Sequence, residues 1–434
     1  MSIRRGRSAI VSWQAVTASE TTPLDYDAII VGGGPAGATA AILLAQAGQH
    51  VALVEKARFP RRKVCGEFIS ASTWPLLGQL GVAQSLREHA GPVVRRVGIY
   101  AGAARLTAPL PPPRQGEVAG ACAVGREVLD TALLTRTGAV GATIWQPWIL
   151  TGYARDAAGY TCRVEDRDAG RSRALHAPVL IAAHGSWESG PLPTQDFRKA
   201  PHPSDMLGFK AVFQGGNLPD DLMPLIAFPG GYGGMVGTQG NGISLSCCIR
   251  RDHLASLRAR WPRPRAGDSV LAHISAHCAG VAATVSEAQL DGPWLAAGPI
   301  RPGIHGFGTG GLFTTGNATA EAHPIVAEGI SMAIQSAFVL CDRLISRQGA
   351  TLTQSALASI RREYASAWRR NFSSRLLAST FYAHLFMRPF STRLAVAAMQ
   401  QFPSLLAIGT RWSGKSEILR SRRNTESPLT EQNF

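Results

Sequence analysis

The hydrophobic positions between residues 27 and 55 follow a strand–helix–strand pattern. Ala28–Val31 and Val51–Val54 are short unbroken apolar runs, which is typical of buried parallel strands. Between them, the Ala- and Leu-rich stretch 38–47 has a strong helix propensity, and Gly48 follows it as a stop signal. The pattern predicts a β–α–β unit in the first part of the chain.

A different pattern runs from residue 188 to residue 295, where short alternating apolar runs are separated by glycine-rich turns. Alternation with a period of two indicates antiparallel strands. The predicted strands cover residues 208–214, 225–228, 233–237 and 242–250, and one helix is expected over 269–278. Residues 93–107 alternate in the same way. A β-sheet domain that carries the substrate is therefore predicted.

The late part of the chain is predicted to be helical. A short strand is expected over 312–316, and a helix over 328–345, where the apolar positions repeat every three or four residues. Two more helices are predicted over 352–370 and 375–388, and residues 71–86 also have a helical pattern.

Composition narrows the classes of partner. The 434 residues include 44 Lys and Arg against 29 Asp and Glu, which gives a net charge of +15. A basic chain can bind nucleic acid or an anionic surface, but no nucleic-acid-binding motif occurs, so no nucleic-acid partner is expected. The seven cysteines have no C-x-x-C spacing, so neither a disulfide framework nor a metal site is predicted. Free thiols fit a reducing compartment, the cytoplasm.

Contact with a membrane surface is a separate question. No apolar run reaches the roughly 18 residues that a membrane-spanning helix needs. Residues 371–411, however, mix apolar and basic side chains without any acid. Leu377, Phe381 and Leu385 are four residues apart, so they share one helix face. This face could lie on an anionic membrane as a peripheral contact, or the helix could instead pack on the protein core.

The candidate chemistry begins at Gly32-Gly33-Gly34-Pro35-Ala36-Gly37, which fits the pattern G-x-G-x-x-G. Gly32 permits the tight turn, Gly34 lets backbone approach a pyrophosphate, and Gly37 lets the helix pack on the strand. The helix N-terminus offers amide donors and partial positive charge to phosphates. Glu55 follows Gly37 by 18 residues, where a carboxylate takes the ribose hydroxyls of an adenosine. A dinucleotide site is predicted.

The segment after the second strand is basic and contains Lys56, Arg61 and Lys63 before Cys65-Gly66-Glu67. Its cations could meet a pyrophosphate, or they could form a solvated loop. Cys65 could face the substrate side of the cofactor or be a small core residue. Glu67 could deliver a proton, or it could be a structural partner of Arg61 or Lys63. These two residues are the candidate catalytic groups.

Residues 316–333 read G-N-A-T-A-E-A-H-P-I-V-A-E-G-I-S-M-A. This stretch resembles the motif G-D-A-A-G-x-x-x-P-x-x-G-E-G-I-x-x-A of FAD-dependent oxidoreductases of the geranylgeranyl reductase family. These are relatives of the aromatic hydroxylases with the p-hydroxybenzoate hydroxylase fold. The matching positions are Gly316, Pro324, Glu328, Gly329, Ile330 and Ala333, and the resemblance covers roughly residues 25–345.

The resemblance implies further contacts with FAD. Asn317 stands where the family has an Asp that binds a ribityl hydroxyl, and Asn keeps an acceptor oxygen. His184-Gly185 stands where the family has Asp-Gly, and Arg126 matches a family Arg with Asp130 as its acid. Together with the glycine turn, the predicted FAD contacts are Gly32, Gly34, Pro35, Ala36, Gly37, Glu55, Lys56, Arg61, Lys63, Cys65, Arg126, Gly316, Asn317, Pro324, Gly329 and Ile330.

The resemblance also sets the expected domain organisation of an α/β protein. A Rossmann-like, GR2-type FAD-binding domain is interrupted by an inserted antiparallel β-sheet substrate domain and is followed by a helical C-terminal region. The predicted division assigns 25–92, 119–187 and 296–346 to the FAD-binding domain, 93–118 and 188–295 to the β-sheet domain, 347–415 to the C-terminal helices, and 1–24 and 416–434 to disordered ends.

Two reactions fit this fold, because the fold alone does not select a reaction. A flavin enzyme of this kind could reduce a carbon–carbon double bond of a lipophilic, isoprenoid or polyketide-like substrate. It could instead hydroxylate an aromatic ring or polyketide with oxygen. The Cys65-Gly66-Glu67 segment and the Glu328-Gly329-Ile330 turn favour the reductase. Halogenation is disfavoured because no W-x-W-x-I-P stretch occurs, and a non-catalytic flavin-binding protein is the third alternative. NAD(P)H could serve as a transient electron donor, although no second nucleotide turn occurs.

Overall fold

The computed structural model describes residues 23–110, 120–187, 190–192, 200–261, 263–349, 351–402 and 404–406. The ends that were predicted to be disordered, 1–24 and 416–434, lie outside these residues except for Pro23 and Leu24. Leu24 lies in a short strand, β1 (Leu24–Asp25), which pairs with β11. Residue 24 is therefore part of the fold and not of an extension.

The cofactor-binding half is built on a five-stranded parallel sheet. The strands lie in the order β19-β12-β2-β3-β8 and every neighbouring pair is parallel. They are β2 (Ala28–Val31), β3 (Val51–Val54), β8 (Thr143–Trp145), β12 (Val179–Ala182) and β19 (Leu312–Thr314). The predicted β–α–β unit and the mixed α/β fold class are confirmed, because apolar side chains of these strands are buried on both faces of the sheet.

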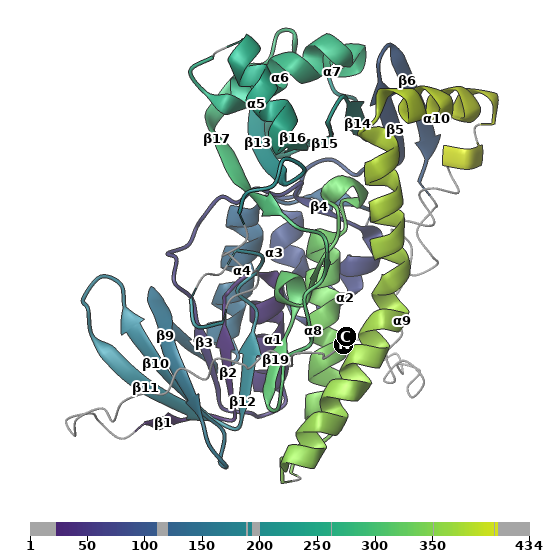
Figure 1. Cartoon of the computed structure of the whole chain (residues 1–434). Helices are drawn as coiled ribbons and strands as arrows, with labels where there is room; N and C mark the ends of the chain where they lie inside the picture. The colour runs from purple at the N-terminus through teal and green to yellow at the C-terminus, as the bar shows by residue number, and fades with distance from the viewer. Residues whose placement is uncertain are drawn as a thin grey trace, which may run out of the picture.

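Two layers cover this sheet (Figure 1). Ile30 and Leu53 point to one face, where α1 (Pro35–Gln46), α4 (Arg126–Ala139) and α8 (Gly329–Ile345) pack together. Ile29 and Ala52 point to the other face and pack against the antiparallel strands β9 (Trp148–Arg155), β10 (Tyr160–Asp166) and β11 (Ser172–Ala177). Alternation along each strand thus supplies two hydrophobic cores.

The second half is a seven-stranded sheet in the order β17-β13-β16-β15-β14-β5-β6. Its strands are β5 (Arg96–Ala101), β6 (Ala104–Pro109), β13 (Met206–Gln214), β14 (Leu222–Phe228), β15 (Gly231–Gly237), β16 (Gly242–Arg250) and β17 (Gln289–Ile300). All neighbouring pairs are antiparallel except β14 and β5, which are parallel. The expected strand over 93–107 is a hairpin, because Gly102 adopts a φ of +57° and turns the chain.

Three helices cover one face of this sheet, where the sequence predicted a single helix over 269–278. They are α5 (Arg251–Arg260), α6 (Ala266–His277) and α7 (Ala279–Val285). Leu254, Val270 and Val281 bury against the sheet in one hydrophobic cluster. The other two helices escaped prediction because they are short and polar or small in composition.

The remaining elements are short. They are β4 (Phe68–Ile69), β7 (Cys122–Ala123), β18 (Gly303–Ile304), β20 (Ala320–Glu321), α2 (Trp74–Gln79), α3 (Ala83–Arg87) and the 3-10 helices η1 (Ala71–Thr73), η2 (Gln239–Asn241), η3 (Gly316–Ala318) and η4 (Pro324–Val326). The helix predicted over 71–86 is broken into three pieces. Pro75 lies in the first turn of α2, and Gly81, with a φ of +77°, separates α2 from α3.

One long helix, α9 (Gln354–Phe386), replaces the two helices predicted over 352–370 and 375–388. Residues 371–374 contain neither Gly nor Pro, and Phe372 is completely buried within the helix. Figure 1 shows α9 running beside α8 and reaching the seven-stranded sheet, where α10 (Pro389–Gln401) turns back across β5 and β6.

A buried polar cluster attaches α9 to the start of α8. Arg375 donates a hydrogen bond to Gln335 Oε1 at 2.7 Å, and its Nη1 lies 3.9 Å from Oε2 of Glu328. Glu328 is completely buried, as is Ser70, which donates to the same carboxylate at 3.4 Å. A buried carboxylate of this kind is tolerated only with a positive partner.

We expect Arg375→Met to destabilise the protein by about 3–5 kcal/mol, because it leaves the buried charge of Glu328 without its cation. Urea denaturation measures the loss. The double variant Arg375→Met/Glu328→Gln should recover a large part of it. A single variant as stable as the wild type would contradict the assignment of this ion pair as a structural clamp.

Candidate active site

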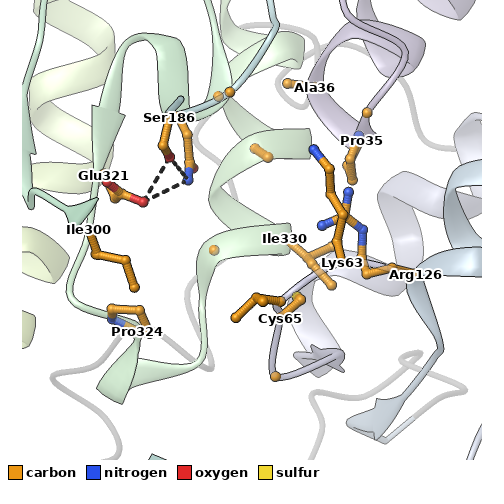
Figure 2. A pocket seen from close by; sticks show the side chains of 18 of the residues that line it. Pro35, Ala36, Lys63, Cys65, Arg126, Ser186, Ile300, Glu321, Pro324 and Ile330 are labelled. Atoms are coloured by element: carbon orange, nitrogen blue, oxygen red, sulfur yellow. Dashed lines mark hydrogen bonds between the residues drawn. The ribbon is translucent and has the colours of Figure 1, made fainter. Parts of the chain in front are cut away.

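A cavity of about 410 Å³ lies between the parallel sheet and the seven-stranded sheet. It extends from the turn after β2, past the start of α4, to the start of α8 and the strands β14–β16. Its lining includes nearly all the predicted cofactor contacts: Gly32, Gly34, Pro35, Ala36, Glu55, Lys56, Arg61, Lys63, Cys65, Arg126, Gly316, Asn317, Pro324, Gly329 and Ile330. Figure 2 shows Lys63 and Arg126 on one side of the cavity, with Ser186 and Glu321 across from them.

The glycine turn opens the N-terminus of α1 toward the cavity. Gly32 has a φ of +108°, and an added Cβ would lie 2.6 Å from the carbonyl oxygen of Ala183. Gly37 lies outside the cavity lining, since its role is packing: a Cβ there would lie 1.8 Å from the oxygen of Gly32. A Cβ on Gly34 would meet no atom closer than 3.9 Å and would point toward Arg126 and Arg61. Gly34 therefore leaves open space for a ligand beside the helix amides.

Glu55 sits at the end of β3 with only 3% of its surface exposed. Its Oε2 accepts a hydrogen bond from Gly33 N at 2.7 Å, and its Oε1 accepts one from Ala57 N at 2.7 Å. Arg61 lies 3.4 Å from the same carboxylate. Backbone amides thus fix the carboxylate at the edge of the cavity, where a hydroxyl group could take the place of the long hydrogen bonds that Arg61 donates to both oxygens at 3.4 Å.

The wall next to this turn carries excess positive charge. Arg126 is buried and donates to both oxygens of Asp130, at 2.8 and 2.7 Å, as the sequence pattern predicted. Burial and the neighbouring guanidinium groups of Arg61 and Arg126 lower the pKa of Lys63 to about 8. Three cations against the carboxylates of Asp130 and Glu55 leave a net charge that favours an anion such as a pyrophosphate.

The two candidate catalytic residues, Cys65 and Glu67, lie in different environments. Cys65 lines the cavity and its Sγ accepts a weak hydrogen bond from Glu67 N at 3.4 Å. Glu67 is buried and pairs with Lys210 of β13, and it also accepts from Arg126 N at 3.2 Å. Of the two alternatives for Glu67, a structural pairing is found, but with Lys210 of β13 in the other sheet rather than with Arg61 or Lys63. Held in this ion pair, Glu67 is a structural group rather than a free proton donor.

Beside the glycine turn, Gly316 adopts a φ of +62° and lets the chain pass close to Ala36, where a Cβ would lie 2.8 Å from the Ala36 side chain. Pro324 begins η4, and α8 then starts at Gly329 with its first turn at the cavity wall. A second helix N-terminus therefore points into the same cavity as α1.

Glu321 is an acid in this cavity that the sequence analysis missed. It is 5% exposed, and its Oε1 accepts from Ser186 Oγ at 2.8 Å and from Asn317 Nδ2 at 3.3 Å (Figure 2). Its Oε2 accepts from Arg301 N at 3.3 Å. Burial raises the pKa of Glu321 to about 7, although the hydrogen bonds from Ser186 and Arg301 act in the opposite direction. The acid is thus partly protonated near neutral pH.

Tyr232 and His323 form a neutral pair in the same cavity wall. The Tyr232 hydroxyl lies 2.9 Å from His323 Nδ1. Burial, and to a smaller extent the neighbouring His384, lowers the pKa of His323 to about 4. Burial also raises the pKa of Tyr232 well above its usual range. The pair is uncharged at neutral pH, so it can orient a substrate by hydrogen bonding without adding charge.

A cavity lined by the N-termini of α1 and α8 and by the acid Glu55 fits a long cofactor with a pyrophosphate, and the fold is that of a flavin-dependent enzyme. The chain belongs to the FAD binding domain family, whose model matches residues 25–374. Its cofactor is FAD, in agreement with the open space at Gly34, the fixed carboxylate of Glu55 and the basic wall.

The fold is similar to that of solved flavin-dependent and reductase-like proteins. A flavin-dependent brominase superposes with a TM-score of 0.70 at 17% identity, over 90% of this chain and 94% of that chain. A geranylgeranyl bacteriochlorophyll reductase-like protein from Thermoplasma acidophilum superposes with a TM-score of 0.67 at 15% identity, over 90% and 100%. At these identities the superpositions show the fold alone.

Among curated proteins, Menaquinone reductase of Mycolicibacterium smegmatis is 30% identical over 133 residues, which is 31% of this chain and 32% of that protein. The chain matches no more than about a third of the length of such relatives. In the described part of the chain, no helix is long and apolar enough to cross a membrane.

We expect Gly34→Val to lose bound FAD while the protein stays folded, because the added side chain would enter the cavity beside Arg126 rather than the protein core. Flavin absorbance after gel filtration measures the loss, and circular dichroism checks the fold. Gly78→Val, on an exposed part of α2 with no atom within 4 Å of an added Cβ, is the matched control. Full retention of FAD by Gly34→Val would refute the placement of the pyrophosphate.

Proposed function

We propose that the protein is a reductase of carbon–carbon double bonds in a lipophilic, isoprenoid or polyketide-like substrate, of the geranylgeranyl reductase type. The observation that carries this proposal is the buried acid Glu321 in the substrate-facing part of the cavity. Saturation of a double bond needs a hydride and a proton. FAD, when bound and reduced, would supply the hydride, and Glu321 in its neutral form would supply the proton.

Glu321 accounts for the proton of this reaction. One carbon of the double bond gains the hydride, the other gains the proton of the Glu321 carboxyl group, and a carboxylate remains. The hydroxyl of Ser186 and the amide of Asn317 already donate to that carboxyl group, so they stabilise the carboxylate that forms. The carboxylate then recovers a proton from water. The electrons come from an external donor, for which NAD(P)H is a candidate.

The wall opposite FAD supports a lipophilic substrate. The cavity surface contributed by the second sheet is mainly apolar, with Met223, Leu225, Met235 and Val236 from β14 and β15, together with Ile300 from β17. The neutral Tyr232 and His323 pair adds a hydrogen-bonding site without charge. An apolar chamber with few polar groups binds an apolar molecule and excludes water from the reaction.

The names of the relatives support more than one reaction. The Menaquinone reductase and geranylgeranyl reductase-like matches support reduction. A match to 6-methylpretetramide 4-monooxygenase of Streptomyces rimosus, 41% identical over 63 residues, supports mono-oxygenation. FAD-dependent hydroxylation of an aromatic ring or polyketide is therefore the second candidate, and it is favoured by the same apolar cavity. A flavin-binding protein without catalysis is the third candidate. No W-x-W-x-I-P stretch occurs in this chain, which speaks against halogenation.

The two main candidates differ in their need for oxygen. If the enzyme is a double-bond reductase, its chemically reduced flavin should be reoxidised without oxygen when polyprenyl or polyketide substrates are added, and the product should gain two hydrogens. Stopped-flow absorbance and mass spectrometry measure both. Product formation only in the presence of oxygen, with one oxygen atom incorporated, would replace the proposal by the hydroxylase.

We expect Glu321→Gln to slow anaerobic reoxidation by substrate by about 100-fold or more, because general acid catalysis contributes that much. Reoxidation of the reduced flavin by oxygen should remain. Glu287→Gln, at an exposed position, is the matched control. Equal rates in the wild type and Glu321→Gln would remove Glu321 from the reaction.

Glu321 also predicts a pH dependence of stability. Its pKa is higher in the folded protein, about 7, than its ordinary value of 4.5, so folding favours the neutral form. The wild type should lose stability relative to Glu321→Gln as pH rises from about 4.5 to just above 7, by about 3 kcal/mol in total. Urea denaturation at several pH values measures this difference. A difference that does not change with pH would contradict the raised pKa.

A further inference from the structure

The exposed apolar side chains are concentrated on one part of the surface. Ten large hydrophobic residues are exposed in the described chain, and six of them belong to residues 377–405. These six are Leu377 (67% exposed), Phe381 (52%), Phe390 (76%), Leu394 (58%), Phe402 (60%) and Leu405 (42%). They come from the last turns of α9, from α10 and from the residues just after it, and we call them the α9–α10 patch. Single exposed apolar residues need no explanation, but a group of this size marks an interaction surface.

The charge around this patch has one sign. Arg388 and Arg393 are exposed on the segment that carries the patch, and Arg370 is exposed further back on α9. No Asp or Glu occurs from residue 364 to residue 406. Arg375, which the sequence analysis counted among the basic residues of this segment, is instead buried against α8 and takes no part. Large apolar side chains bordered by arginine fit a surface that is apolar inside and anionic outside.

The patch shares its packing with the substrate cavity. Phe386 and Val396 are buried beneath it, in the same hydrophobic cluster as Tyr232, Ile300 and Ile325. The latter three residues line the cavity. One hydrophobic cluster therefore connects the outer apolar surface with the cavity that would hold a lipophilic substrate.

We propose that the α9–α10 patch docks the protein on the surface of an anionic phospholipid bilayer, with Phe381 and Phe390 inserted between the lipid headgroups. The patch holds the molecule as a peripheral protein, with its apolar side chains in the interface and its arginines at the phosphates. This placement applies to reductase and hydroxylase chemistry alike, so its failure leaves the proposed reaction untouched.

Charge argues against two other occupants. A second copy of the chain, related by a twofold axis, would place Arg388 and Arg393 against the same arginines of its partner without an acid to compensate. Residues 407–434 contain five Lys and Arg against three Glu, so this segment is also net positive. An anionic bilayer is the occupant that complements both the apolar and the basic side chains.

Vesicle flotation with the full-length, FAD-loaded protein tests the proposal. Binding is expected to vesicles of phosphatidylcholine with phosphatidylglycerol, to weaken with added salt, and to be much lower with phosphatidylcholine alone. The variant Phe381→Ser/Phe390→Ser should bind anionic vesicles at least tenfold more weakly and keep its FAD. Trp261→Ser/Ile304→Ser is the matched control, because these side chains are exposed to a similar extent, 47% and 45%, outside the patch. The control should bind as the wild type does.

Four results would overturn the proposal. The first is no binding to anionic vesicles at low salt, and the second is equal weakening of vesicle binding by the patch and control variants. The third is a dimer in analytical ultracentrifugation that only the patch variant dissociates while vesicle binding is unchanged. The fourth is vesicle binding that requires prior removal of residues 407–434. The third result would assign the patch to a second copy, and the fourth would assign it to the chain's own C-terminal segment.

Discussion

The ion pair between Glu67 and Lys210 holds the two halves of the cavity together. Glu67 ends the segment that brings Arg61 and Lys63 to the pyrophosphate side, and Lys210 lies on β13 in the substrate sheet. Both side chains are almost fully buried, at 2% and 3% exposure, so water cannot solvate either charge in place of its partner. The same carboxylate accepts from Arg126 N, which fixes the start of α4. One buried ion pair thus fixes the cofactor side of the cavity relative to the substrate side.

Much of the fold was predictable because its signals are local. The sequence placed the first β–α–β unit correctly, with its strands at 28–31 and 51–54 and the glycine turn between them. All three features lie within fewer than 30 consecutive residues, so a local pattern was enough to find them. Most of the second sheet was expected from alternation, but its edge strand β17 (Gln289–Ile300) was not. The parallel pairing of β5 with β14 was not expected either, because it joins residues far apart in sequence. The continuity of α9 was missed because Phe372 is buried by tertiary packing. Its polar sequence neighbours gave no sign of that burial.

The candidate site was predicted where it depends on backbone and missed where it depends on distant partners. The glycines and Glu55 are set by one β–α–β unit, so spacing sufficed to find them. Glu321 owes its raised pKa to burial, and its hydrogen-bond partner Ser186 is 135 residues away in sequence. The available signal was Asn317, which stands where the resembling family has Asp. An Asp at 317 would place a second carboxylate about 3.3 Å from Glu321, and two such groups cannot both ionise. The amide removes this repulsion and donates a hydrogen bond instead.

The long helix α9 has a consequence for how the protein unfolds. With 33 residues it is about 50 Å long. Near its start, Tyr364 and Trp368 belong to the hydrophobic core of the parallel sheet, and near its end Phe386 belongs to the core beside the substrate sheet. Melting either end removes packing from one core and weakens the support for the other. The two halves are therefore coupled into one cooperative unit, in which neither sheet keeps its full stability after the other has opened.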